Sequence, residues 1–147
     1  MNEIRRALGP VLGLLLIVLL LASCGTSASK SVTATILIEA DPATNRWVDG
    51  VVLPDGGNGY ELLEAAVSGE LEAEFFSAFG SHFVSSILGI KPEGSAFWGV
   101  FVWNTDINGW EPLTVGADLF DVEDDQIMAW AIVEFNTDRP QLPASQP

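Results

Sequence analysis

Several residue types are scarce in this 147-residue chain, and each shortage excludes a class of function. One cysteine, Cys24, leaves no possibility of an internal disulfide. With a single histidine, His82, and no second cysteine, the chain lacks a nitrogen and sulfur ligand set for zinc. Only 6 Lys and Arg residues stand against 20 Asp and Glu residues, which gives a net charge of −14. A surface of this sign disfavours nucleic acid and anionic lipid as partners.

The sequence motifs of common enzyme classes are also missing. No Gly-x-Ser-x-Gly nucleophile elbow occurs, and residues 56–59 (Gly-Gly-Asn-Gly) lack the lysine and the spacing of a phosphate-binding loop. The serines have no partner base other than His82, which we interpret as an ordinary residue at the start of a strand. Pairs of carboxylates carry little information in so acidic a chain. The sequence therefore predicts a protein that is not an enzyme.

The N-terminal residues are typical of a secretory signal peptide over residues 1–23. Arg5-Arg6 is positively charged, and residues 11–21 are almost wholly Leu, Val and Ile. Leu21-Ala22-Ser23-Cys24 resembles the lipobox of bacterial lipoproteins, which implies cleavage before Cys24 and attachment of lipid to that residue. We expect an exported protein anchored to the lipid bilayer, on the outer face of the cell membrane. The alternative is a plain signal peptide with an incidental cysteine.

Composition divides the rest of the chain into three parts. Residues 24–31 are small and polar after the cysteine, which predicts a flexible tether. Residues 136–147 contain three prolines and show no periodicity, so we expect an irregular tail. The folded domain is therefore expected over residues 32–135, a length at which a single hydrophobic core is adequate.

The first half of this domain predicts a hairpin followed by a helix. Apolar and polar residues alternate over residues 32–39, and residues 46–53 read as a second strand. A helix is expected over residues 60–67, because Asn58 and Glu61 have the spacing of a capping box. The apolar stripe of this helix consists of Leu62, Leu63, Ala66 and Val67.

The second half predicts mainly strands. Residues 71–79 fit either a strand or an irregular aromatic segment, whereas residues 82–87, 96–103 and 127–135 each indicate a strand. Residues 108–112 are expected to lie in a loop. This order fits an α+β fold of the β-grasp type, a mixed or antiparallel sheet with one short helix packed on one face. The first and last strands then lie side by side at the centre.

Residues 96–103 are apolar on both faces of the expected strand. Trp98 lies on one face and Phe101 on the other. A strand that is apolar on both faces is covered on both faces. The helix covers one of them, and the other requires a loop, another protomer or a ligand.

Aromatic side chains near the end of this strand are the candidates for ligand binding. An exposed aromatic patch with a polar edge commonly marks a binding site. The candidate residues are Trp98, Trp103, Asn104 and Trp110. An acidic cluster further along the chain supplies oxygen ligands of the kind that calcium prefers, although its spacing is not that of an EF-hand. The calcium candidates are Asp118, Asp121, Asp124 and Asp125.

A series of short motifs resembles the transcobalamin C-terminal-like domain, which is also described as a domain of unknown function in bacterial surface proteins. The motifs are Val52-Leu53-Pro54-Asp55-Gly56 before the helix, residues 79–90, Phe97-Trp98 leading to Asn104, Val115-Gly116-Ala117-Asp118, and residues 124–130. Phe97 stands where that family usually has tyrosine, and Asp124 stands where it usually has glycine.

The resemblance implies a β-grasp fold and a non-catalytic binding module, with a corrinoid such as cobalamin as the small ligand. In the namesake of the family this domain forms half of the site, and a helical domain absent from this chain forms the other half. Two further hypotheses remain open. One is a cell-surface protein-interaction or structural module without a small-molecule ligand, and the other is an acidic calcium-dependent module.

Overall fold

The computed structural model describes residues 30–134 and 141–147. The expected signal peptide, Cys24, nearly all of the tether and the first part of the tail lie outside these residues. Within the described ranges, no helix has both the length and the apolar character needed to cross a membrane.

The described chain begins with a long hairpin of two strands, β1 (Ser31–Asp41) and β2 (Thr44–Pro54). Both strands extend slightly beyond the predicted ranges. The elements that follow, in chain order, are α2 (Gly59–Val67), β3 (Leu71–Phe76), β4 (Ser81–Ile87), β5 (Ala96–Asn104), β6 (Gly109–Pro112), the 3-10 helix η1 (Ala117–Leu119) and β7 (Ile127–Glu134).

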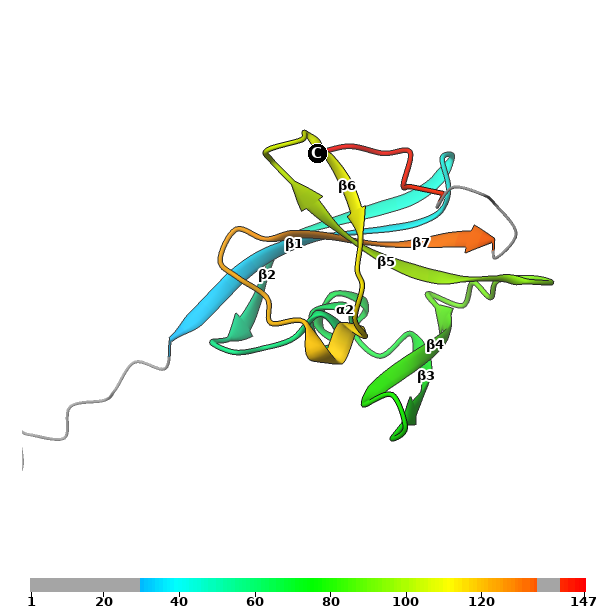
Figure 1. The fold of residues 1–147 in the computed structure, drawn as a ribbon, viewed down its shortest axis with the longest axis horizontal. Helices are drawn as coiled ribbons and strands as arrows, with labels where there is room; N and C mark the ends of the chain where they lie inside the picture. The colour runs from blue at the N-terminus through cyan, green and yellow to red at the C-terminus, as the bar shows by residue number, and fades with distance from the viewer. Residues whose placement is uncertain (1–29, 135–140) are drawn as a thin grey trace, which may run out of the picture.

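Five strands form one mixed sheet in the order β2-β1-β7-β5-β6 (Figure 1). β1 and β7 pair in parallel at its centre, and β5 runs antiparallel to β7. This arrangement confirms the predicted α+β fold with the first and last strands adjacent. β3 and β4 form a separate two-stranded sheet beside α2.

The helix α2 covers one face of the sheet. The Asn58 side chain accepts hydrogen bonds from the backbone N–H groups of Tyr60 and Glu61, and the Glu61 carboxylate accepts one from the Asn58 N–H. The predicted capping box is therefore present. The buried side chains of the helix stripe pack against the sheet, where Trp98 belongs to the same core. We call this core the helix-side core.

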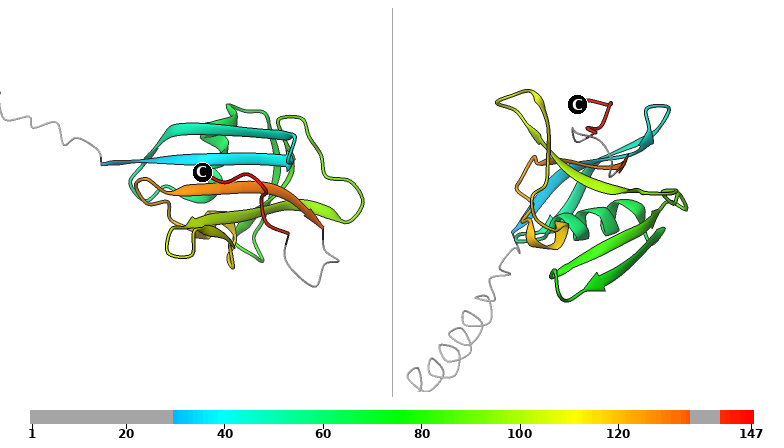
Figure 2. Two further views of the ribbon diagram at one scale, coloured as in Figure 1. Left: turned by 90° about the horizontal axis from the view of Figure 1, so that it is seen from above. Right: turned by 45° about the vertical axis from the view of Figure 1, so that its right-hand side comes forward.

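The opposite face of the sheet carries a second apolar cluster, which we call the far-side core. Its members include Leu37, Phe101 and Trp110, with Trp47 and Trp103 packed against them. Figure 1 and the right-hand view of Figure 2 show residues 141–147 on the side of the sheet away from α2. The sequence predicts that this face is covered, and residues 141–147 of the chain itself lie over it.

One segment differs from the sequence prediction, and for another the structure decides between two alternatives. β6 forms where a loop was expected, and it pairs with β5 so that Trp103 lies opposite Trp110. The reason is the turn residue Asn108, whose φ of 49° lets the chain reverse before Gly109. For residues 71–79 the strand alternative is correct, because Leu71–Phe76 pairs with β4.

Candidate functional site: an aromatic hairpin above a histidine–aspartate pair

The β3–β4 hairpin carries large apolar side chains that face solvent. Phe75, Phe76, Phe79 and Phe83 are exposed by 41% to 76%. Strand register places Phe75 opposite His82 and Glu74 opposite Phe83. Because neighbouring residues alternate between faces, His82 points toward the helix while Phe83 points away from it. The hairpin therefore has an anchored inner face and an aromatic outer face.

A cavity of about 400 Å³ opens at the turn of this hairpin. Its lining consists of Phe76, Phe79, Ser81, His82 and Phe83. The rings of Phe76 and Phe83 meet edge to face, with centroids 6.4 Å apart. The volume lies in the range of small-ligand sites, and an exposed apolar patch of this kind marks an interaction surface.

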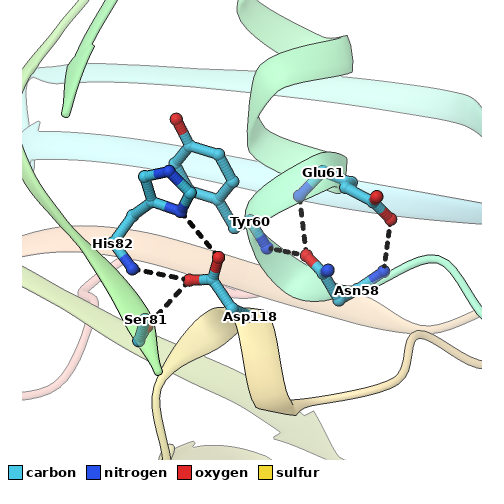
Figure 3. Close-up of polar contacts among 6 residues, drawn as sticks. All are labelled: Asn58, Tyr60, Glu61, Ser81, His82 and Asp118. Atoms are coloured by element: carbon cyan, nitrogen blue, oxygen red, sulfur yellow. Dashed lines mark hydrogen bonds and ion pairs between the residues drawn. The ribbon is translucent and has the colours of Figure 1, made fainter. Parts of the chain in front are cut away.

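Asp118 lies beneath the cavity and joins η1 to the first two residues of β4. One carboxylate oxygen, Oδ1, lies 2.6 Å from Nδ1 of His82 (Figure 3). The other oxygen accepts hydrogen bonds from the His82 backbone N–H and from the Ser81 hydroxyl, both at 2.8 Å. One carboxylate thus fixes both the backbone and the side chain of His82.

The ring of His82 is held on its flat side as well. It stacks on Tyr60 of α2, with ring centroids 3.8 Å apart and planes 5° from parallel. Phe75 approaches the same imidazole edge to face at 5.1 Å. The histidine is therefore a fixed part of the cavity floor, because α2, β3 and η1 all contact its ring.

This environment shifts two pKa values. Burial alone would raise the pKa of the Asp118 carboxyl, but the hydrogen bonds from His82 and Ser81, with the charge interaction with His82, hold it below the ordinary value. Burial raises the pKa of Tyr60 to about 12, and the nearby carboxylates of Glu64 and Asp118 add to the rise. Asp118 is therefore ionised, and Tyr60 neutral, over the physiological range.

Gly116 allows η1 to approach the hairpin this closely. A Cβ atom at this position would overlap Cβ and Oγ of Ser81. The absence of a side chain brings Asp118, two residues later, within hydrogen-bonding distance of Ser81. The motif Val115-Gly116-Ala117-Asp118 thus has a local physical role in building the cavity floor.

The predicted ligand-binding residues lie elsewhere. Trp103 and Trp110 are in edge-to-face contact at 5.1 Å, and the Asn104 amide donates to Glu111. Trp110 is only 4% exposed, beneath the C-terminal segment. Trp98 belongs to the helix-side core at 5% exposure, and its indole N–H has no hydrogen-bond partner within residues 30–134 and 141–147. The structure therefore brings Trp103, Asn104 and Trp110 together but not Trp98.

The calcium candidates do not converge. Both oxygens of Asp118 are bonded to Ser81 and His82, and Asp124 Oδ1 accepts the backbone N–H of Thr33. In the part of the chain that the structure describes, no group of three or more His, Cys, Asp or Glu residues is placed to hold a metal ion.

Sequence reasoning missed both halves of the hairpin site. The signal for the aromatic half was present, since four phenylalanines flank Gly80 within residues 75–83. Reading these residues as two paired strands would have placed the rings on one hairpin. The pairing of His82 with Asp118 has no local signal, because 36 residues separate the two partners.

Comparisons with known proteins support the fold. No protein-family model matches the chain, and no curated protein matches it. The crystal structure of haptocorrin in complex with Cbi is similar over 78% of this chain, with a TM-score of 0.60 and 14% identity. The crystal structure of a protein from Ruminococcus gnavus ATCC 29149, described as a candidate metal-binding protein, is similar over 70% of this chain and 97% of its own, with a TM-score of 0.56 and 15% identity.

The class that these observations define is an α+β domain with the fold found within haptocorrin. The similarity covers 28% of the haptocorrin chain, so this chain corresponds to less than a third of that protein. At 14% and 15% identity, the two similarities establish the fold alone.

Proposed function

We propose that this protein is a non-catalytic binding module whose ligand-contacting surface is the outer face of the β3–β4 hairpin. The observation that carries the proposal is the exposure of Phe76, Phe79 and Phe83 around a cavity with a fixed polar floor. Exposed phenylalanine lowers solubility unless a partner covers it, and the floor of Ser81 and His82 adds polar groups that orient a ligand.

A corrinoid such as cobalamin is the small ligand that we propose. Two observations support it: the motifs that resemble the transcobalamin C-terminal-like domain, and the fold shared with haptocorrin, whose structure contains Cbi. A cavity of about 400 Å³ open to solvent encloses only part of so large a ligand. A lone domain should therefore bind weakly, or bind together with a partner that supplies the other side.

Calorimetric titration of the full chain with cobalamin tests this proposal. A variant carrying Phe79→Ala and Phe83→Ala removes the two most exposed rings of the hairpin. Ile107→Ala is the matched control, because Ile107 is 60% exposed at the β5–β6 turn, away from the hairpin. We expect binding that weakens in the hairpin variant and is unchanged in the control. Absence of binding at millimolar cobalamin overturns the proposal of a corrinoid ligand. Equal binding by both variants overturns the proposal that the hairpin is the binding site.

A protein-interaction module is the second candidate, and the openness of the surface favours it. Phe79 is 76% exposed, which suits a flat partner better than an enclosed ligand. Sedimentation of the full chain at increasing concentration tests the simplest case, a second copy. Association that disappears in the Phe79→Ala and Phe83→Ala variant, but persists in Ile107→Ala, supports this candidate. Sedimentation as a monomer at every concentration counts against self-association.

Anchoring to the outer face of the cell membrane through Cys24 is a further part of the proposal. Its support is the apolar run that ends in Leu21-Ala22-Ser23-Cys24. Labelling cells with a fatty-acid analogue should mark the protein, and Cys24→Ser should abolish both the label and recovery in the membrane fraction. Label retained by Cys24→Ser would contradict the anchor.

A further inference from the structure

A buried carboxylate lies on the far side of the sheet from the helix, remote from the proposed hairpin site. Glu39 of β1 is 5% exposed, close to the apolar far-side core. Its Oε1 accepts the backbone N–H of Ala144 at 2.7 Å, and its Oε2 accepts that of Ser145 at 2.9 Å. A buried carboxylate must be hydrogen-bonded, and two successive backbone N–H groups supply these bonds.

Trp110 makes a further polar contact with Ser145. Its indole N–H donates to the backbone carbonyl of Ser145 at 2.7 Å. Glu39 and Trp110 thus contact two N–H groups and one carbonyl, all from the backbone. Contacts of this kind depend on the bent backbone at Ala144 and not on the side chains of Ala144 and Ser145.

The C-terminal segment, residues 141–147, lies on this surface without joining the sheet. It has no helix or strand, and none of its residues joins the ladder of the sheet. Leu142 remains 49% exposed, and a cavity of about 440 Å³ lies between the segment and the sheet. That cavity is lined by Ala40, Ala131, Ile132 and Leu142, among others. Hydrogen bonds to Glu39 and Trp110 therefore hold the segment, together with the buried Pro143.

We propose that the far side of the sheet is a binding site for a peptide that bends as the chain does at Ala144, built around Glu39 and Trp110. Residues 141–147 occupy this site as a ligand in cis, and another peptide that offers the same backbone groups can replace them. The inference does not depend on the function proposed for the hairpin.

The chemistry of the two side chains restricts what can replace the segment. Departure of residues 141–147 leaves the Glu39 carboxylate and the Trp110 N–H without their observed partners, beside apolar surface. A replacement must bring two N–H donors for Glu39 and one acceptor for Trp110. A peptide with the same bend meets both needs, whereas a hydrocarbon or an anion does not.

The test uses the full chain and a fluorescein-labelled heptapeptide with the sequence of residues 141–147. Ala144→Pro removes the N–H that donates to Glu39 Oε1 and so releases the cis segment. Ala144→Ser keeps that N–H and is the matched control. In the wild type the tethered segment competes at an effective concentration on the order of millimolar, so a micromolar peptide is excluded.

Fluorescence polarisation should show that Ala144→Pro binds the heptapeptide about tenfold or more tightly than the wild type does. Ala144→Ser should behave as the wild type. A heptapeptide that itself carries Ala144→Pro should not bind, because it lacks one of the donors to Glu39. This pattern supports a replaceable peptide ligand.

Three results would overturn the proposal. The first is a folded Ala144→Pro chain that takes up no peptide. The second is equal binding of the peptide by the wild type and by Ala144→Pro, which would place it elsewhere on the molecule. The third is loss of the β-sheet circular dichroism in Ala144→Pro, which would make residues 141–147 an integral part of the fold.

Discussion

The imidazole of His82 and the phenol ring of Tyr60 lie parallel, with centroids 3.8 Å apart. β4 supplies one ring and α2 supplies the other, so this contact joins the hairpin to the helix. A two-stranded hairpin is marginally stable alone in water. The stack and the hydrogen bonds that the Asp118 carboxylate accepts therefore hold the aromatic surface in position.

Replacing Asp118 should loosen this attachment. In the wild type, Ser81 and His82 donate hydrogen bonds to the carboxylate oxygens of Asp118. Asp118→Asn places an amide NH2 group opposite some of these donors and removes the charge. Hydrogen bonds to a charged group stabilise by roughly 1.5–3 kcal/mol. We expect the free energy of unfolding in urea to fall by about 2 kcal/mol. Asp121→Asn, an exposed position nearby, is the control. A fall no larger than that of the control would show that the carboxylate does not hold the hairpin.

The stabilisation by Asp118 should also depend on pH. Its folded-state pKa is lowered from 3.8, so the unfolded chain takes up the proton first as the pH falls. The contribution is fully present above an ordinary carboxyl pKa and is lost as the pH drops through the lower folded value. The stability difference between the wild type and Asp118→Asn should shrink as the pH falls below about pH 4. A constant difference down to pH 2 would contradict this assignment.

Tyr60 is the only tyrosine, so an ultraviolet titration of the folded chain reports on it alone. Burial raises its pKa from 10.0 to about 12. Because the folded chain keeps this proton longer than the unfolded chain, stability is lost as the pH rises from 10 toward 12. Glu64→Gln removes one charge that contributes to the rise and should lower the midpoint. A midpoint near 10, with an unchanged circular dichroism spectrum, would contradict the burial of this ring.

Gly116→Ala should be strongly destabilising. The added methyl group overlaps Ser81, and moving η1 away breaks the hydrogen bonds of Asp118. Overpacking of this kind costs about 1–3 kcal/mol. Gly109→Ala is the matched control, since its nearest contacts lie at an ordinary 3.8 Å. Equal thermal midpoints for the two variants would show that η1 can shift without consequence.

The individual helices and strands could be predicted because their determinants are local. Asn58 and Glu61 have capping-box spacing, and the box is present. Leu37 interrupts the alternation of β1, and it is buried in the far-side core, as expected for a strand covered on both faces. Asn108-Gly109 is typical of a hairpin turn as well. The sequence did not show that Trp110 pairs with Trp103, so this turn could not be assigned to a hairpin.

The two candidate sites could not be predicted because each joins distant segments. Glu39 looks like a solvent-facing residue of an alternating strand, yet it is buried because Ala144 and Ser145 return to it from the end of the chain. Asp118 lies in a stretch rich in carboxylates, and nothing in its neighbours distinguishes it. Only the approach of η1 to β4 assigns Ser81 and His82 to it.

The parallel pairing of β1 with β7 has a consequence for the order in which the protein folds. Residues 35–39 pair with residues 127–131, so the central ladder closes only after nearly the whole chain is available. Pairings between segments so distant in sequence close large loops and slow folding. A ribosome-bound chain that has released only its first hundred or so residues therefore lacks β7, the middle strand, and one edge of its N-terminal hairpin is unpaired.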